Sequence, residues 1–302
     1  MEMLQEVLKF GNNWTLDVNN HFQNFMEPLQ AENNAKLSSR VTVQKGVKYG
    51  DDERHRLDIY SSTIPAKGAE KVPVVVYVHG GGFTMGDTDI TPSMHGNVGC
   101  YFATHGCLGV LATYRLVPAA SFPQGAKDIG SIVAWLVLNA HKWGGDPAQI
   151  YLIGQSAGGV HLATALFTGL LKDWNDNLGG IVLQSAPLWY NLTSPWRRHT
   201  MRQYHRTDRH EDITAKMAVN LFEKCTTEEV DNWPPVLQML AEFDPDEIVD
   251  GNLRFVDAFR KKMQRIPRLE VMKGHNHVSY VLGVGLPENT IGARLLAFVH
   301  GQ

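Results

Sequence analysis

The first forty residues carry apolar side chains at the spacing of a helix. Phe22, Phe25, Met26 and Leu29 follow one another at i, i+3, i+4 and i+7, which places them on one helical face. We therefore expect residues 1–40 to be helical. Because this segment precedes the first strand-like pattern, its apolar face must pack against elements that come later in the chain.

The pattern then becomes that of strands. Residues 40–50 and 55–62 are strand-like, and in "RLDIY" apolar and polar side chains alternate. Such alternation is typical of a strand with one face in water. We therefore expect the second of these segments to be an outer strand of a sheet.

Continuous apolar runs follow, most of them too apolar for an exposed sheet and each too short for a helix. They occupy residues 72–80, 108–116, 150–156, 180–186 and 236–243, with a more polar run at 268–274. Helical patterns at 124–143, 157–172 and 251–264 separate most of these runs. Buried strands that alternate with helices are typical of a largely parallel sheet covered on both faces.

One interval, residues 187–234, interrupts this rhythm. It is rich in aromatic residues, Arg and His, and it is longer than one crossover helix requires. It is either a decorated crossover or a cap over the carboxyl edge of the sheet, where open α/β folds bind ligands. We favour the cap, which the N-terminal helices of residues 1–40 could complete, within a single domain spanning residues 1–302.

Composition excludes several classes of protein. Hydrophobic residues make up 43% of the chain and charged residues 20%, which favours a packed globule over disorder. The net charge of −3 provides no basic field for nucleic acid. No stretch resembles a signal peptide or a membrane span. Three sparse cysteines, Cys100, Cys107 and Cys225, suit a reducing compartment, so we expect a cytoplasmic protein.

The motif G-x-S-x-G occurs once in a suggestive setting, as "GQSAG" at residues 154–158. It follows the apolar run "IYLI" and precedes a helical pattern, which is the strand–turn–helix context that a nucleophile elbow requires. Ser156 would then project its hydroxyl above the sheet at the positive end of the following helix. His161, on the same helix, is expected to be a packing histidine.

A serine hydroxyl needs a base, and the base needs an orienting acid. In this order of elements the acid and then the histidine follow the serine, each just past a strand end. The candidates for the acid are Asp244, Asp246 and Asp250; we favour Asp244 because it comes first after its strand. The candidates for the base are His275 and His277 in "KGHNHVSY".

Three consecutive glycines follow a histidine in "YVHGGGFTMGD", residues 77–87. Acyl transfer creates an oxyanion that needs preorganised N–H donors. An HGGG-type loop and the residue after the nucleophile supply such donors, which indicates Gly81, Gly82 and Ala157. A phosphate-binding loop is disfavoured because the G-x-G-x-x-G spacing and the Walker lysine are missing.

At this point the chain resembles the hormone-sensitive-lipase-like α/β-hydrolases, which include microbial carboxylesterases. The motifs that carry the resemblance occur in the same order: "HGGGFTMGD", "YRLVPAASFPQGAKDI", "WGGDPAQIYLIGQSAGG", "AEFDPDEIVD" and "GHNH". They cover residues 74–277. The kynurenine formamidase-like hydrolases share many of them, and Gln155 before the serine leans toward these and toward feruloyl-esterase-like proteins.

The resemblance implies an α/β-hydrolase fold, with a mostly parallel sheet of about eight strands and Ser–Asp–His chemistry. It implies Ser156 as nucleophile, Asp244 as acid and His277 as base, since His277 ends a G-x-x-H pattern that begins at Gly274. It implies that His79 braces the glycine loop. It implies no metal and no organic cofactor.

We therefore predict a serine hydrolase that cleaves a carboxylic ester, or a lactone or thioester, of a small and largely apolar substrate. The alternatives are an aryl formamidase of the kynurenine formamidase type and a tailoring hydrolase of a biosynthetic pathway. A binding protein without turnover is disfavoured because all three triad positions are filled. We expect no nucleic-acid partner and no membrane span; a homodimer is one of the open oligomeric states.

Overall fold

A computed structural model describes residues 2–64 and 71–301. Its centre is an eight-stranded sheet with the strand order β1-β2-β4-β3-β5-β6-β7-β8. The two contacts of β2 are antiparallel and the other pairs are parallel. This confirms the predicted, mostly parallel sheet. The strands are β1 (Val41–Lys48), β2 (Arg56–Ser62), β3 (Val72–Val78), β4 (Leu108–Ala112), β5 (Gly145–Gln155), β6 (Leu178–Gln184), β7 (Val236–Phe243) and β8 (Arg268–Asn276).

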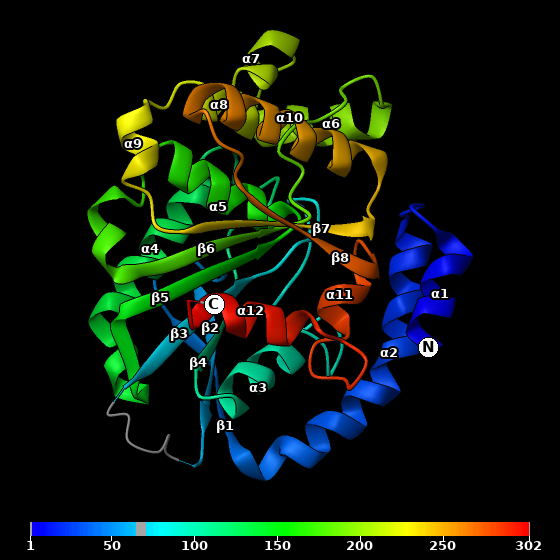
Figure 1. Cartoon of the computed structure of the whole chain (residues 1–302), viewed down its shortest axis with the longest axis vertical. Coiled ribbons are helices and arrows are strands. Elements are labelled where there is room, and N and C mark those ends of the chain that lie inside the picture. The colour runs from blue at the N-terminus through cyan, green and yellow to red at the C-terminus, as the bar shows by residue number, and fades with distance from the viewer. Residues whose placement is uncertain (1, 65–70, 302) are drawn as a thin grey trace.

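Helices cover both faces of the sheet, because its central strands are apolar on both sides. In β3, Val74, Val76 and Val78 join one core cluster, and Val75 and Tyr77 join the other. The first cluster includes side chains of α4 (Gln124–Asn139), α5 (Ala157–Phe167) and α10 (Asp246–Met263). The second includes side chains of α3 (Gly96–Thr104) and α12 (Ile291–Val299), on the opposite face in Figure 1.

The expectation that residues 55–62 form an outer strand is wrong. β1 is the edge strand, and β2 lies between β1 and β4. The Asp58 side chain, whose place in "RLDIY" indicated a wet face, is buried and accepts a hydrogen bond from the backbone N–H of Gly46 at 2.8 Å. A polar residue between apolar ones gives the same sequence pattern whether its side chain faces water or, like Asp58, is buried with a backbone donor.

The N-terminal segment is helical as predicted, but its buried face differs from the expected one. It forms α1 (Glu2–Phe10), α2 (Leu16–Leu37) and the short helix η1 (Ser38–Arg40). Phe22 and Met26 are fully buried, whereas Leu29 is 40% exposed. Gln30 is buried instead, because its amide donates to the carbonyl oxygens of Leu282 and Val284 at 2.7 and 3.0 Å.

The 187–234 interval forms four short helices that lie with α10 at the top of the molecule, while α1 and α2 lie at one side (Figure 1). Local signals explain two of these helices. Pro195 occupies the first turn of α6, where its missing N–H costs nothing, and Thr226 and Glu229 form a capping box on α9. The helices are α6 (Pro195–His205), α7 (His210–Thr214), α8 (Ala218–Phe222) and α9 (Thr227–Asp231).

Three short helices complete the described chain: η2 (Ala140–Trp143), η3 (Lys172–Asn177) and α11 (Ser279–Leu282). The helical pattern expected at 251–264 begins earlier, at Asp246, and the strand expected at 150–156 begins at Gly145. Within residues 2–64 and 71–301, no helix is both long enough and apolar enough to span a membrane.

Candidate active site

Ser156 stands in the tight turn between β5 and α5, with φ 51° and ψ −118°. Only small neighbours allow this turn. A Cβ at Gly154 would lie 2.7 Å from the Cα of Gly159, and a Cβ at Gly158 would lie 2.3 Å from the carbonyl oxygen of Val78. A left-handed φ at a serine is strained backbone, which the packed strand and helix on either side impose. These are the features of the nucleophile elbow that the sequence predicts.

The structure brings Ser156, Asp244 and His277 together. Nε2 of His277 lies 3.0 Å from Oγ of Ser156, and Nδ1 of His277 lies 2.8 Å from Oδ1 of Asp244. An ionised carboxylate only accepts hydrogen bonds, so Nδ1 carries the proton and Nε2 is free to accept one from the serine. This relay can increase the nucleophilicity of the hydroxyl.

The carboxylate of Asp244 is held by two further donors. Its Oδ2 accepts hydrogen bonds at 2.7 Å from both Oγ of Ser185 and the backbone N–H of Ala241. With Oδ1 on His277, each oxygen of this buried group has a partner. Ser185 was not singled out from the sequence, since a serine after an apolar strand is a weak signal.

The alternative candidates do not reach Ser156. Nδ1 of His275 lies 3.1 Å from Oγ of Ser279, and burial lowers the pKa of His275 to about 4. Asp246 begins α10 and its Oδ1 accepts a hydrogen bond from Nδ2 of Asn12 at 2.9 Å. Asp250 lies one turn further along the same helix. His277 and Asp244 are therefore the histidine and the carboxylate that face the serine.

The glycine loop lies beside the serine. Gly81 has φ 120° and Gly82 has φ 59°, values that favour glycine. The carbonyl oxygen of Gly81 accepts hydrogen bonds from the N–H groups of Thr84 and Met85 at 3.2 and 3.1 Å, which closes the turn. Gly81, Gly82 and Ala157, the first residue of α5, all line the cavity above Ser156.

That cavity has a volume of about 720 Å³. Its walls come from two parts of the chain: the N-terminal helices and the 187–234 interval. The glycine loop and the carboxyl edge of the sheet, with the serine, the histidine and the start of α10, form the floor. The helical segments contribute Trp14, Leu16, Asn19 and Gln23 from one side and Trp196, Arg197, His199, Thr200 and Gln203 from the other.

Two contacts made by residues of the walls are not predicted by any motif in the sequence. The Trp14 ring packs edge-on against the His277 ring, with ring centres 5.7 Å apart. Arg197 is paired with Glu247 through N–O distances of 2.6 and 2.9 Å, and Glu247 also accepts from the N–H of Asn191 at 3.0 Å. The enrichment of the 187–234 interval in Arg was the sole signal for the Arg197 contact, and no pattern in the sequence indicated the Trp14 contact beyond the expected cap role of residues 1–40.

His161 lies in the core and not in the cavity. Its Nδ1 is 3.4 Å from the Tyr204 hydroxyl, and its ring packs edge-on against Tyr114 and Phe83. Burial lowers its pKa to about 4, so the ring is neutral near neutral pH. This agrees with the packing role expected for it.

Within the described part of the chain, no cluster of three His, Cys, Asp or Glu side chains is placed to hold a metal ion. The three cysteines are free thiols, and burial raises the pKa of each. A thiol with a raised pKa is a poor nucleophile. None of the three cysteines lines the cavity above Ser156.

Comparison with known proteins places this site in a family context. The family model BD-FAE matches residues 57–223, which is more than half of the chain. Carboxylesterase NlhH from Mycobacterium tuberculosis is 36% identical over 125 residues, which cover 41% of this chain and 36% of that protein. Isoprenylcysteine alpha-carbonyl methylesterase ICME from Arabidopsis thaliana is 31% identical over 131 residues, which cover 43% of this chain and 29% of that protein. These alignments span about a third of the curated relatives' own length.

Solved structures resemble the whole chain at lower sequence identity. Esterase B from Lactobacillus Rhamnosis has a TM-score of 0.70 and 17% identity, and the match covers 93% of this chain and 94% of that chain. An esterase from Pyrobaculum calidifontis has a TM-score of 0.67 and 20% identity, and the match covers 99% and 97% of the two chains. These similarities confirm the α/β-hydrolase fold.

Proposed function

The chain belongs to the BD-FAE family, and from this premise we propose that it is a serine hydrolase that cleaves carboxylic esters through an acyl-enzyme. One observation carries the proposal: Oγ of Ser156, the ring of His277 and the carboxylate of Asp244 form a hydrogen-bonded series of 3.0 and 2.8 Å at the floor of a cavity. The named relatives are esterases, which favours an ester over an amide.

Acylation would begin with attack of Oγ of Ser156 on the ester carbonyl carbon, while Nε2 of His277 takes the hydroxyl proton. The carbonyl oxygen becomes an oxyanion, and the N–H groups of Gly81, Gly82 and Ala157 stabilise it. The tetrahedral intermediate collapses when the C–O bond to the alcohol breaks. His277 then protonates the leaving alkoxide, and the acyl group stays on the serine.

Deacylation would repeat these steps with water as the nucleophile. Nε2 of His277 removes a proton from water, the hydroxide adds to the acyl carbon, and the same N–H groups stabilise the second oxyanion. The acid leaves when the bond to Oγ of Ser156 breaks and His277 returns the proton. Throughout, Asp244 keeps the proton of His277 on Nδ1 and stabilises the positive ring, and Ser185 and Ala241 fix that carboxylate.

We propose that residues 1–40 and 187–234 act together as the cap of a single domain spanning residues 1–302. Both segments contribute side chains to the cavity walls, including Trp14 and Trp196. The enclosed volume of about 720 Å³ suits a small organic ester rather than a polymer segment. The cytoplasmic location and the lack of a cofactor stay predictions, and the oligomeric state stays open, with a homodimer among its alternatives.

The experiment is a turnover panel of p-nitrophenyl acetate, butyrate and octanoate beside an aryl formamide. We expect saturable hydrolysis of at least one ester, with kcat/KM above that of the formamide, and its loss in Ser156→Ala. Ser131→Ala, an exposed serine on α4, is the control. Preference for the formamide would instead establish the amidase alternative, and turnover of neither would favour a tailoring enzyme with one complex substrate.

A further inference from the structure

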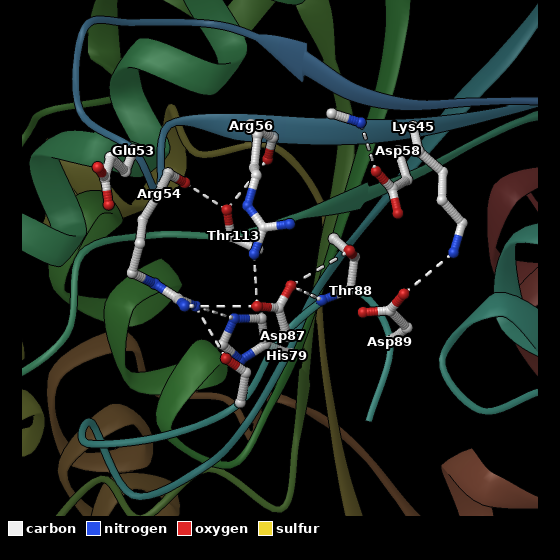
Figure 2. A network of polar contacts seen from close by, with 12 residues as sticks. Lys45, Glu53, Arg54, Arg56, Asp58, His79, Asp87, Thr88, Asp89 and Thr113 are labelled. Carbon is white, nitrogen blue, oxygen red and sulfur yellow. Dashed lines mark hydrogen bonds and ion pairs between the residues drawn. The ribbon is translucent and has the colours of Figure 1, made fainter. Parts of the chain in front are cut away.

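A network of charged side chains contacts the glycine loop at His79, Gly86 and Asp87. Figure 2 shows the Arg54 guanidinium beside His79 and Asp87, with Arg56, the first residue of β2, reaching the same Asp87. Arg54 lies in the turn just before β2, so it is distant in sequence from the HGGG motif. None of the motifs in the sequence includes it.

The Arg54 guanidinium contacts both ends of the loop. Its Nη2 donates to the carbonyl oxygen of Gly86 at 2.8 Å and lies 3.3 Å from Nε2 of His79. Its Nε donates to the carbonyl oxygen of Tyr114 at 2.7 Å, and Nη1 lies 3.5 Å from Oδ2 of Asp87. Nε and Nη2 thereby fix the plane of the guanidinium, and Nη2 links His79 to Gly86.

These contacts decide which ring nitrogen of His79 carries the proton. A guanidinium has five donors and no acceptor, so Nε2 of His79 must be the acceptor toward Arg54. The proton is then on Nδ1, which donates to the carbonyl oxygen of Gly80 at 2.6 Å. Burial lowers the pKa of His79 to about 3, so the ring stays neutral at ordinary pH.

The ring is also fixed in its plane. Tyr114 stacks on it with ring centres 4.6 Å apart and donates its hydroxyl to the carbonyl oxygen of His79 at 2.9 Å. Rotation of the ring would break the stacking on Tyr114 and the contact to Arg54. The hydroxyl hydrogen bond fixes the backbone carbonyl of the same residue. His79 therefore presents one fixed donor to the loop.

That donor sets the direction of a backbone N–H. In a planar trans peptide the C=O and the N–H point in opposite directions. Because the Gly80 carbonyl is held on the His79 side, the N–H of Gly81 in the same peptide unit points the other way. Gly81 lines the cavity, whereas the buried His79 does not. The direction of this N–H thus follows from the tautomer of His79.

We propose that Arg54 is a positioning residue, which selects the Nδ1–H tautomer of His79 and thereby keeps the N–H of Gly81 directed into the cavity. This role rests on the proposed function, in which that N–H stabilises an oxyanion. Arg54 acts through His79 and through the Gly86 carbonyl, and it does not line the cavity itself.

The chain offers a matched control. Arg56 has the same charge, and its Nη2 lies 2.5 Å from Oδ2 of Asp87, a shorter distance than that of Arg54. The structure gives Arg56 no hydrogen bond to His79 or Gly86 among the described residues. Substitution of either arginine therefore removes an ion pair with Asp87. Only substitution of Arg54 also removes the contacts to His79 and Gly86.

The kinetic test compares Arg54→Met with Arg56→Met on the best ester of the panel. For Arg54→Met we expect kcat to fall roughly 10- to 100-fold with KM nearly unchanged, because a misdirected donor affects the transition state more than substrate binding. Arg56→Met should stay within about two-fold of wild type in both constants, since its loss leaves every donor in place. Equal kcat values for the two variants would overturn the proposal.

A second measurement does not depend on turnover. The 15N shifts of the two ring nitrogens of a neutral imidazole differ between tautomers, and the His79 signals are assigned by their absence in His79→Gln. We expect wild type and Arg56→Met to show the Nδ1–H form and Arg54→Met to lose that preference. An Nε2–H form in the wild type would overturn the proposal even if Arg54→Met fails to fold. Absence of ester turnover with the expected shifts would instead reject the proposed function alone.

Discussion

The cavity floor and the cavity walls are held by different means, although both face the same space. On the floor, Asp244 and His277 are buried, and each is fixed by short hydrogen bonds at strand ends. On the walls, side chains from two distant segments face the cavity, and Trp196 is 54% exposed. The floor has one arrangement that the backbone imposes, whereas the walls depend on contacts between helices.

This difference separates two tasks. Groups that act on the developing charge must be preorganised, because movement at the moment of reaction costs energy. Groups that select a substrate need only provide a fitting surface, and substitutions there change binding. We therefore expect variants of the floor to change kcat and variants of the walls to change KM.

The largest effect is expected from His277→Ala. Removal of the base should lower kcat by roughly 10⁴-fold or more, because the triad acts as a unit. His275→Ala is the control on the same strand end, and it should retain most of the activity, since His275 faces Ser279. Steady-state ester hydrolysis measures both. The reverse result would transfer the role of base to His275.

A smaller loss is expected from Gly82→Val, which forces a β-branched residue into a left-handed backbone with φ 59°. The shift of the loop should lower kcat by roughly 10²- to 10³-fold, as loss of one oxyanion donor does. Gly106→Val is the matched control, because Gly106 has φ 80° and no atom within 4 Å of an added Cβ, but lies outside the cavity. If both variants turn over esters equally, the oxyanion role of Gly82 is wrong.

The next effect concerns the stability of the cap. His205 in α6 is buried, and neither of its ring nitrogens has a partner among the described residues. Burial first, and then the Lys216 ammonium, lower its pKa to about 3, against 6.5 for a free histidine. Between these values the unfolded chain binds the proton that the folded chain does not, so stability falls as the pH decreases from 6.5 toward 3.

His205→Phe should therefore reduce the acid sensitivity of the fold. At pH 5, protonation of His205 in the unfolded chain lowers the free energy of unfolding by about 2 kcal/mol. Phenylalanine cannot bind this proton, and it preserves the ring contacts with Phe122 and Tyr204. Urea unfolding at pH 7 and pH 5 measures the difference, with the exposed His210→Phe as control. An unchanged difference between the two pH values would show that His205 is not a source of the acid sensitivity.

The smallest effect is expected from Trp196→Ala in the wall. Loss of one half-exposed ring should raise KM for p-nitrophenyl octanoate by roughly five-fold, about 1 kcal/mol of apolar contact. We expect the two-carbon acyl group of the acetate ester to make little contact with the ring, so its kinetics should not change. Leu138→Ala, an exposed apolar residue outside the cavity, is the control. A drop in kcat for the acetate ester would contradict the division between floor and walls.

The same division describes what the sequence could predict. The floor follows from local patterns: an elbow between a strand and a helix, an acid after β7 and a histidine after β8. Those signals identified Ser156, Asp244 and the central strands, because each depends on few neighbours in the chain. They left His275 and His277 as candidates for the base, and the family resemblance favoured His277. The catalytic roles of these residues stay predictions that the variants above test.

The features that were wrong or missed depend on contacts between distant segments. Asp58 imitates a wet face because its partner, Gly46, is on another strand. Leu29 fits the helical period, yet Gln30 is buried because Leu282 at the end of α11 and Val284 just beyond it offer carbonyl oxygens. Arg54 lies outside every motif, and its role appears only when the loop at Gly86 folds against it. Periodicity along one segment contains no information about such partners.

The most direct test of the central claim is covalent labelling by a fluorophosphonate, followed by mass spectrometry of the labelled peptide. The account predicts one phosphonyl group per chain, located on Ser156, and its loss in Ser156→Ala with the fold intact by circular dichroism. Labelling of Ser156→Ala at the wild-type rate, or a label on another serine, would contradict the claim that the elbow of β5 and α5 carries the nucleophile.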